Sequence, residues 1–192
     1  MDYQDITVAV QDDIATVTLN RPQKLNAYTT LMGNELTHAY EYLSKREDVR
    51  VVIMTGAGRG FCSGADVGAV FQKDINQRST SETPRGGEVV HPRSGLHYAL
   101  RNCAKPTIAA INGPAVGIGL TLTLLQDIRI MAEEASMGAI FARMGLMPEL
   151  GSTFMLPRLV GLAKALELTY TAKILKAQEA LDIGLVNQVV PG

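Results

Sequence analysis

Two glycine-rich segments of this chain could perform chemistry through the main chain rather than through side chains. The first, "GAGRGFCSGADV" at 56–67, follows the apolar run "VVIMT", and the second, "NGPAVGIGL" at 112–120, follows the apolar run "TIAAI". A glycine-rich bend that enters a helix exposes backbone N–H groups, and the helix dipole adds positive potential there. Two such bends facing each other would offer two donors to one developing oxyanion. Losing one such donor typically costs about 3 to 4 kcal/mol of transition-state stabilisation.

The glycines of these two segments also have other uses in proteins. A tight turn explains most single glycine bends, because glycine permits positive φ and close backbone approach. The spacing of "GAGRG" does not match a dinucleotide fingerprint, and no acidic residue stands about twenty residues later, where a ribose partner is expected. A phosphate-binding loop is excluded because no G-K-[ST] occurs in the chain. Tight turns and an oxyanion site therefore remain.

Alternating strands and helices must position the two bends. We expect an N-terminal β-hairpin in "ITVAV" and "IATVTL", a helix over 29–46, a strand over 51–55 covered on both faces, and a short helix after Gly64. "TIAAI", a helix over 117–125 and the strand "DIRIMA" make a second unit. This alternation favours an α/β fold with a largely parallel sheet. The apolar residues near helical spacing in the first helix are Leu31, Leu36, Ala39, Tyr40 and Leu43.

The remaining segments are a polar loop and a helical C-terminal part. Residues 73–95 are rich in Ser, Thr, Gly and Pro, so we expect a surface loop of the kind that covers a ligand, followed by a helix over 94–104. After Gly138, helical patterns run through "IFARMG", "STFMLPRLVG", "LAKALELTYTA" and "AQEALDIG", and "LVNQVVPG" ends in a strand. The segment 106–126 is uncharged, but its glycines, proline and asparagine favour a buried strand, turn and helix over a membrane span.

The composition limits the classes of partner and compartment. Eighteen basic and nineteen acidic residues form no basic block, so we expect neither nucleic acid nor an anionic membrane as a partner. With 46% hydrophobic residues the chain can bury a core, and we treat 1–192 as a single domain. Cys62 and Cys103 form no CxxC pair and the N-terminus has no signal pattern, which favours a cytoplasmic protein without a zinc site.

Four motifs, taken in order, resemble one known family. "LNRPQKLNA", "GRGFCSGADV", "AAINGPAVGIGL" and "GLMPELGSTFMLPRLVG" are similar to the successive motifs of the crotonase superfamily, the enoyl-CoA hydratase/isomerase proteins. The resemblance extends from the N-terminal hairpin to "ALDIGLVNQVVP", nearly the whole chain. It implies a crotonase-like (ClpP/crotonase) α/β fold of repeated ββα units and an acyl-CoA thioester as ligand. No metal or redox motif is present, so we expect no cofactor other than the coenzyme A of the substrate.

The resemblance also implies where the ligand binds. It places the oxyanion N–H donors on Ala65, in "SGAD", and on Ile118, just after Gly117. The channel for coenzyme A is expected to consist largely of backbone and apolar atoms. The implied substrate- and CoA-binding residues are Lys24, Leu25, Ala27, Cys62, Ser63, Ala65, Asp66 and Val67, together with Gly117, Thr121 and Phe141.

The position of acidic residues distinguishes the reactions of this family. Its hydratases use two glutamates, and the matching positions here are Thr121 and Phe141, neither of which can act as an acid or base near neutral pH. The same substitutions weaken a dienoyl-CoA isomerase interpretation. Glu149, in "MPELGS", matches the single catalytic glutamate of some Δ3-Δ2-enoyl-CoA isomerases. It would take a proton from C2 and return it at C4, in an apolar surround that raises its pKa. That surround is expected to be Phe141, Leu146, Met147 and Leu150.

Structural roles are the alternatives for several of these residues. A glutamate before "LGST" also favours a helix N-terminus, by about 0.3 to 1 kcal/mol. We expect Cys62 to pack rather than attack a substrate, Asp66 to cap the helix after Gly64, and Asp127 and Arg129 to be structural. The methionines are expected to fill the core or to line an acyl pocket, and the three histidines to lie at the surface or support other residues.

We therefore expect an acyl-CoA enzyme of fatty acid metabolism, a one-glutamate enoyl-CoA isomerase. The alternatives are hydration, dehydration or thioester hydrolysis on the same fold, and a catalytically silent acyl-CoA-binding homologue. Members of the family usually continue into further helices that cover the active site and join subunits. This chain stops at Gly192, so we expect a shortened C-terminal helical region. A homotrimer or a dimer of trimers is expected if those helices exist in the native chain.

Overall fold

A computed structural model describes residues 2–66, 68 and 95–192 of the chain. The loop expected over 73–95 lies outside the described residues except for Gly95. The helix expected after Gly64 falls largely outside them as well.

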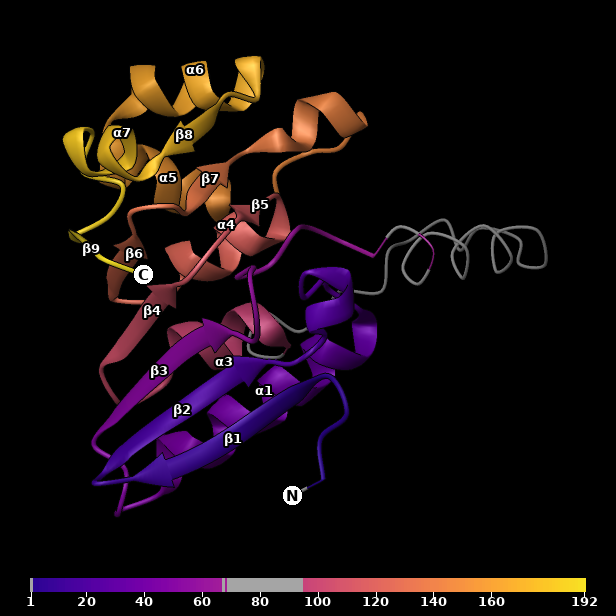
Figure 1. Ribbon diagram of the computed structural model, residues 1–192, viewed down its shortest axis with the longest axis vertical. Coiled ribbons are helices and arrows are strands. Elements are labelled where there is room, and N and C mark those ends of the chain that lie inside the picture. Colours follow the sequence, from indigo (N-terminus) through magenta and orange to yellow (C-terminus); the bar gives the residue numbers. More distant parts are fainter. Residues whose placement is uncertain (1, 67, 69–94) are drawn as a thin grey trace.

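A six-stranded sheet forms the centre of the fold (Figure 1). Its strands follow the order β1-β2-β3-β4-β6-β9. The first two form the expected antiparallel hairpin, and every later neighbour is parallel, as the alternation of strands and helices predicted. The strands are β1 (Ile6–Gln11), β2 (Ile14–Leu19), β3 (Val51–Gly56), β4 (Thr107–Ile111), β6 (Ile128–Ala132) and β9 (Gln188–Val190).

The parallel pairing brings both glycine-rich segments to the same edge of this sheet. Met54 of β3 pairs with Ala109 of β4, and Ile111 of β4 pairs with Met131 of β6. Because β3 and β4 run in the same direction, the segments that follow them leave the sheet at the same end. The two bends therefore start as neighbours in space although 44 residues lie between the segments 56–67 and 112–120.

Two helices pack against the large sheet, α1 (Thr30–Lys45) and α3 (Leu96–Arg101). Residues of β3 alternate between fully buried and half-buried, so the expected cover on both faces is wrong: the core lies on one face. Leu31 is also not a core residue, since it is 41% exposed. The helix begins at Thr30, and its phase directs Met32 inward in place of Leu31.

A second layer of small elements lies beyond the carboxyl ends of β3 and β4. It contains a three-stranded sheet of order β5-β7-β8, whose strands are too short to give a strand pattern in the sequence. The helices expected after Gly138 are present, although the first is a short 3-10 turn. The elements are β5 (Ala115–Val116), α4 (Ile118–Leu124), β7 (Ser136–Gly138), η2 (Ile140–Met144), α5 (Ser152–Val160), α6 (Leu162–Thr171), β8 (Ile174–Lys176) and α7 (Ala177–Asp182).

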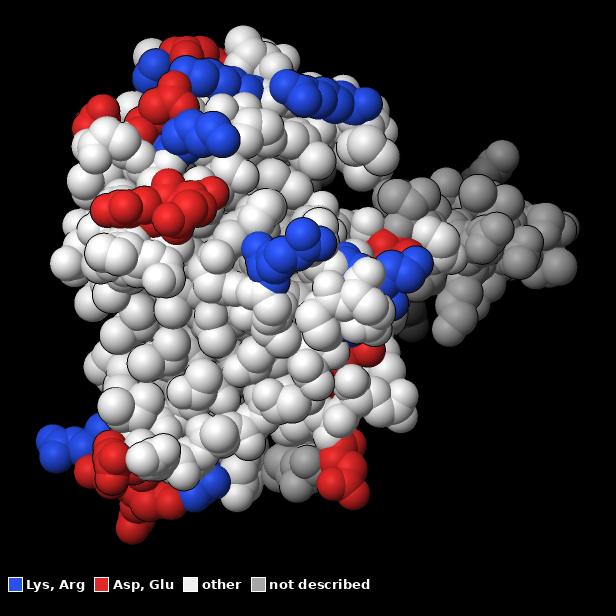
Figure 2. Space-filling model, viewed as in Figure 1, with Lys and Arg blue, Asp and Glu red and all other residues white. Residues whose placement is uncertain are grey.

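Charged side chains are spread unevenly over the surface (Figure 2). On the face shown there, described acidic and basic residues mix at both ends and at mid-height on the right, and a broad uncharged area lies between the middle and the lower end. The uncharged segment 106–126 folds as β4, β5 and α4, as expected for buried strand, turn and helix. Among the described helices, none has the length and apolar character required to span a bilayer.

Candidate active site

The two glycine bends lie beside each other, beyond the carboxyl ends of β3 and β4 in the large sheet. Gly64 and Gly117 both have positive φ, 110° and 56°, which a side chain would strain. A Cβ built on Gly117 would lie 3.9 Å from the Gly64 Cα. The segments are also tied through their main chains, since Cys62 N–H donates to the Pro114 carbonyl and Val116 N–H donates to the Cys62 carbonyl.

In the first bend, the amide N–H of Ala65 points away from Tyr28, the residue with which Ala65 is paired. Ala65 forms a parallel bridge with Tyr28, in which Tyr28 N–H donates to the Gly64 carbonyl and Asp66 N–H donates to the Tyr28 carbonyl. The flanking residues thus make both bonds of the bridge. The N–H of Ala65 itself points to the opposite side. It forms no hydrogen bond with the described residues.

The second bend presents the amide of Ile118 at the start of a helix. Gly117 precedes α4 as its N-cap, and its carbonyl accepts the first helical bond from Thr121 N–H. Ile118 is the first helical residue, so its N–H is one of the amides for which the helix has no acceptor. Within the part of the chain that the structure describes, no other group accepts from it.

A cavity of about 510 Å³ brings these two amides together with one carboxylate. Its wall is mostly apolar, a character typical of ligand pockets. Of the described residues that line it, Glu149 alone carries a carboxyl group. The lining residues are Tyr28, Ser63, Gly64, Ala65, Gly117, Ile118, Ile140, Phe141, Met144, Leu146, Met147 and Glu149.

Glu149 occupies a tight turn immediately before α5. Leu150 and Gly151 have positive φ, 49° and 72°, and Ser152 N–H donates to the Glu149 carbonyl. The backbone of Glu149 thus forms a hydrogen bond with the first residue of α5. Its side chain is bound by α4 instead, where Thr121 Oγ1 donates to Glu149 Oε1 at 2.8 Å. The alternative role of a helix-start charge therefore does not account for where the carboxylate lies.

Burial governs the ionisation of the groups around this carboxylate. It raises the pKa of Glu149 above its usual value, and the hydrogen bond from Thr121 opposes that rise. Burial raises the pKa of Tyr28 to about 12, with a further contribution from the Glu149 charge. Burial likewise raises the pKa of Cys62 to about 11. Cys62 is therefore a thiol at neutral pH, which fits its expected packing role.

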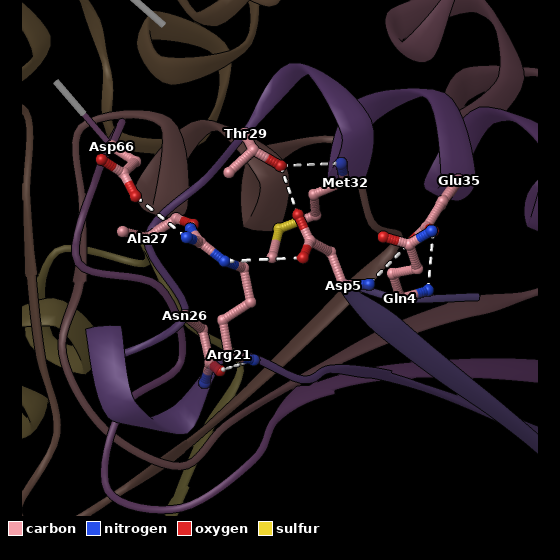
Figure 3. A network of polar contacts seen from close by, with 9 residues as sticks. All are labelled: Gln4, Asp5, Arg21, Asn26, Ala27, Thr29, Met32, Glu35 and Asp66. Carbon is pink, nitrogen blue, oxygen red and sulfur yellow. Dashed lines mark hydrogen bonds and ion pairs between the residues drawn. The ribbon is translucent and has the colours of Figure 1, made fainter. Parts of the chain in front are cut away.

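A polar network braces the first bend from the side of the hairpin (Figure 3). Arg21 forms ion pairs with Asp66 at 3.0 Å and Asp5 at 3.5 Å. Asp5 also accepts a hydrogen bond from Thr29, whose hydroxyl oxygen caps α1 by accepting from Met32 N–H at 2.9 Å. The network joins the end of the hairpin, the start of α1 and the residue next to Ala65. Oδ2 of Asp66 pairs with Arg21, and the helix that Asp66 is expected to cap falls largely outside the described residues.

The residues implied by the sequence fall into two groups. Ser63, Ala65, Gly117, Ile118, Phe141 and Glu149 line the cavity. The other residues lie behind or beside the cavity. Thr121 and Cys62 are fully buried. Lys24 and Leu25 contact the lining residue Ser63, whose hydroxyl donates to the Lys24 carbonyl and whose amide donates to the Leu25 carbonyl. Lys24, Leu25, Ala27, Cys62, Asp66 and Thr121 are absent from its wall, and Val67 lies outside the described residues.

Three lining residues were not singled out from the sequence: Tyr28, Ile140 and Met144. Ile140, Phe141 and Met144 share the i, i+1, i+4 spacing of one helical face, and this signal could have revealed Met144. Met147 and Leu146 line the cavity as expected, but they are 83% and 40% exposed and so form its outer lip. Leu150, expected in the same surround, does not line the cavity.

Two charged residues near β6 have the structural roles expected of them. Asp127 accepts from both the amide and the hydroxyl of Thr107, and Arg129 is buried, donating to the carbonyls of Leu185 and Gln126. Within the described part of the chain, no three His, Cys, Asp or Glu residues are grouped as a metal site requires.

Comparison with known proteins gives a consistent result. A family model described as enoyl-CoA hydratase/isomerase matches residues 9–192. The chain is 37% identical over 191 residues to a probable enoyl-CoA hydratase of Rhodobacter capsulatus, covering 100% of this chain and 70% of that protein. It is also 37% identical over 182 residues to 1,2-epoxyphenylacetyl-CoA isomerase of Escherichia coli, covering 94% of this chain and 68% of that protein.

Solved structures agree in fold. The structure of a putative enoyl-CoA hydratase from Streptomyces coelicolor superposes with a TM-score of 0.86 at 35% identity, covering 99% of this chain and 68% of that one. The four motifs, the paired glycine bends and these similarities lead to one assignment. The chain belongs to the enoyl-CoA hydratase/isomerase family of the crotonase superfamily and has its crotonase-like α/β fold.

Proposed function

We propose that this protein moves the double bond of a 3-enoyl-CoA thioester to the 2-position, with Glu149 as the single base. The observation that carries the proposal is the composition of one cavity. Two backbone amides, Ala65 and Ile118, and one carboxylate, Glu149, lie on the same mostly apolar wall. These are the groups that a proton transfer next to a thioester carbonyl requires.

The reaction can be followed atom by atom. Glu149 takes a proton from C2, and the electron pair left there is delocalised onto the thioester oxygen as an enolate. The amides of Ala65 and Ile118 donate to that oxygen and stabilise its negative charge. Glu149 then returns the proton to C4, while the double bond shifts from C3–C4 to C2–C3. No electron is gained or lost, so we propose that the substrate's coenzyme A is the only cofactor-like group involved.

Burial of Glu149 suits this role. Because burial raises the pKa of the carboxyl, Glu149 is a stronger base than an exposed glutamate and a ready proton donor in the return step. The apolar lip of Leu146 and Met147, together with the lining residue Met144, would exclude water that could compete for the enolate. The same residues favour an apolar acyl group in the cavity.

Hydration is the second candidate, because relatives of this chain are named enoyl-CoA hydratases. Water addition would need a second acid or base beside Glu149. The cavity wall offers Phe141 at one of the matching positions, and Thr121 is buried behind the wall at the other. This arrangement supports isomerisation over hydration.

The test uses two substrates in separate incubations. With a 3-enoyl-CoA we expect a 2-enoyl-CoA product, identified by chromatography and mass spectrometry. With a 2-enoyl-CoA we expect no gain of the mass of water. A 3-hydroxyacyl-CoA product would replace the proposal with hydration, release of free coenzyme A would indicate hydrolysis, and binding without turnover would indicate a silent homologue. Dialysis against EDTA should leave the isomerisation rate unchanged.

A further inference from the structure

Thr121 is placed to act on Glu149 without touching a substrate. Thr121 lies on α4 one turn after Ile118 and is 0% exposed. Its Oγ1 is 2.8 Å from Glu149 Oε1 and 3.0 Å from the Ile118 carbonyl oxygen. It does not line the cavity, so any effect on chemistry must pass through one of these two partners.

The hydroxyl has only one hydrogen to share between its two neighbours. The Ile118 carbonyl is an acceptor, and an ionised Glu149 is an acceptor only. The Ile118 carbonyl is also positioned for the ordinary helical bond along α4. A hydrogen bond to a charged oxygen is the stronger of the two choices. Thr121 therefore donates to Glu149 Oε1 when the carboxylate is ionised.

The second carboxylate oxygen is in a different position. Oε2 of Glu149 forms no hydrogen bond with the described residues, and the carboxyl lies on the cavity wall. The two oxygens are therefore unequal: one is anchored behind the wall, and the other is free to face a bound acyl chain. A single base that serves both C2 and C4 needs this freedom at one oxygen.

We propose that Thr121 is a positioning residue that anchors Oε1 of Glu149, so that Oε2 alone takes the proton from C2 and returns it to C4. The assignment of the carbons rests on the proposed function. The anchored oxygen serves as a pivot, and the carboxyl turns about it while the proton stays inside the cavity. The same hydrogen bond opposes the rise that burial causes in the pKa of Glu149.

Other ionisable groups surround the carboxyl and must be considered in any titration. Tyr28 lies on the cavity wall, and Cys62 lies beneath the first bend. His97 of α3 reaches the turn after Glu149, since a Cβ built on Gly151 would lie 2.7 Å from its Nε2. The residues of η2 that line the cavity are apolar.

The test compares Thr121→Val, which removes the hydroxyl and keeps the branched shape, with Thr121→Ser, which keeps the hydroxyl. Carbon-13 NMR of the glutamate carboxyls would follow Glu149 in the ligand-free protein, with Glu149→Gln identifying its signal. We expect the Glu149 titration to move to higher pH in Thr121→Val and to stay in place in Thr121→Ser. The kcat of Thr121→Val should fall about 10- to 100-fold at unchanged KM.

A second readout reports the path of the proton. In D₂O, Thr121→Val should incorporate more solvent deuterium at C4 of the product than the wild type or Thr121→Ser. A Glu149 titration in Thr121→Val identical to that of the wild type would overturn the role of Thr121, whatever reaction the protein catalyses. A wild-type protein without isomerase activity would instead defeat the proposed function, because the NMR titration requires no turnover.

Discussion

The backbone of Gly119 rests directly on the carbonyl of Cys62. A Cβ built on Gly119 would lie 2.2 Å from that oxygen and 2.9 Å from the Cys62 Cβ. Cys62 comes just before the first bend, and Gly119 follows the Ile118 amide of the second. This contact therefore packs the two bends, which carry the two proposed oxyanion donors, closely against each other.

Gly119→Ala should separate the two bends. Alanine favours a helix by about 1 kcal/mol over glycine, yet we expect a net loss of about 1 to 3 kcal/mol in the free energy of unfolding, because the methyl group cannot fit beside the Cys62 carbonyl. Urea unfolding measures this loss. Gly68→Ala is the control, since Gly68 has no positive φ and its added Cβ meets its nearest atom, Asp66 Oδ1, at an ordinary contact distance of 3.7 Å. If Gly119→Ala were no less stable than Gly68→Ala, the close contact would not matter.

Glu149→Gln should abolish isomerisation while preserving thioester binding. The amide keeps the size of the side chain but cannot accept the proton, so we expect kcat to fall by about 10² to 10⁴. Calorimetry with a non-reactive acyl-CoA analogue should give an affinity close to that of the wild type. Glu47→Gln, at an exposed glutamate that does not line the cavity, should be fully active. Near-normal turnover by Glu149→Gln would remove it as the base.

The pH dependence of stability should reveal the cost of burying Glu149. Its pKa in the folded state is raised above the ordinary value of 4.5, so the folded protein holds this proton more tightly than the unfolded chain. Stability from this group is fully present below 4.5 and is lost as pH rises through the raised pKa. We therefore expect Glu149→Gln to gain stability relative to the wild type across that window. Urea unfolding of both proteins at several pH values measures it, and a constant difference would contradict the burial effect.

The same shift sets the acidic limit of activity. Glu149 must be ionised to accept the C2 proton, so kcat/KM should fall as pH drops through its raised pKa. The midpoint of this fall in kcat/KM should lie at a higher pH than the usual pKa of a glutamate. A pH profile limited only at or below the ordinary glutamate value would contradict this expectation.

Ile118→Pro should remove one oxyanion donor and leave the fold in place. Proline has no N–H but is tolerated at the first position of a helix, which is where Ile118 stands in α4. We expect kcat to fall about 10² to 10³-fold, the typical cost of losing one donor. Ile118→Val is the matched control, because it retains the amide and trims one methylene. Activity in the proline variant equal to that of the valine variant would exclude this amide from the reaction.

Much of the fold could be predicted from the sequence because its signals are local. The hairpin, α1, β3, β4 and β6 follow from runs of apolar residues bounded by turn residues, and such runs are long enough to be distinctive. The phase of α1 was missed at Leu31, since a shift of one residue depends on where the Thr29 cap begins the helix. The strands β5, β7 and β8 gave no signal because two or three residues carry no periodicity.

The sequence alone determined the ordered motifs, the two glycine bends and the presence of Glu149 without the paired carboxylates of a hydratase. The tertiary structure decided which atoms meet. Because β3 and β4 are parallel, both bends lie at the same edge of the large sheet. The bridge between Tyr28 and Ala65 turns the Ala65 N–H away from Tyr28. The hydroxyl of Thr121, which does not line the cavity, donates a hydrogen bond to the Glu149 carboxylate. The Thr121–Glu149 hydrogen bond and the Tyr28–Ala65 bridge join residues that lie 28 and 37 positions apart in the chain. The number of residues between two positions does not predict their distance in space at such separations. Which of them come into contact depends on how the strands and helices pack.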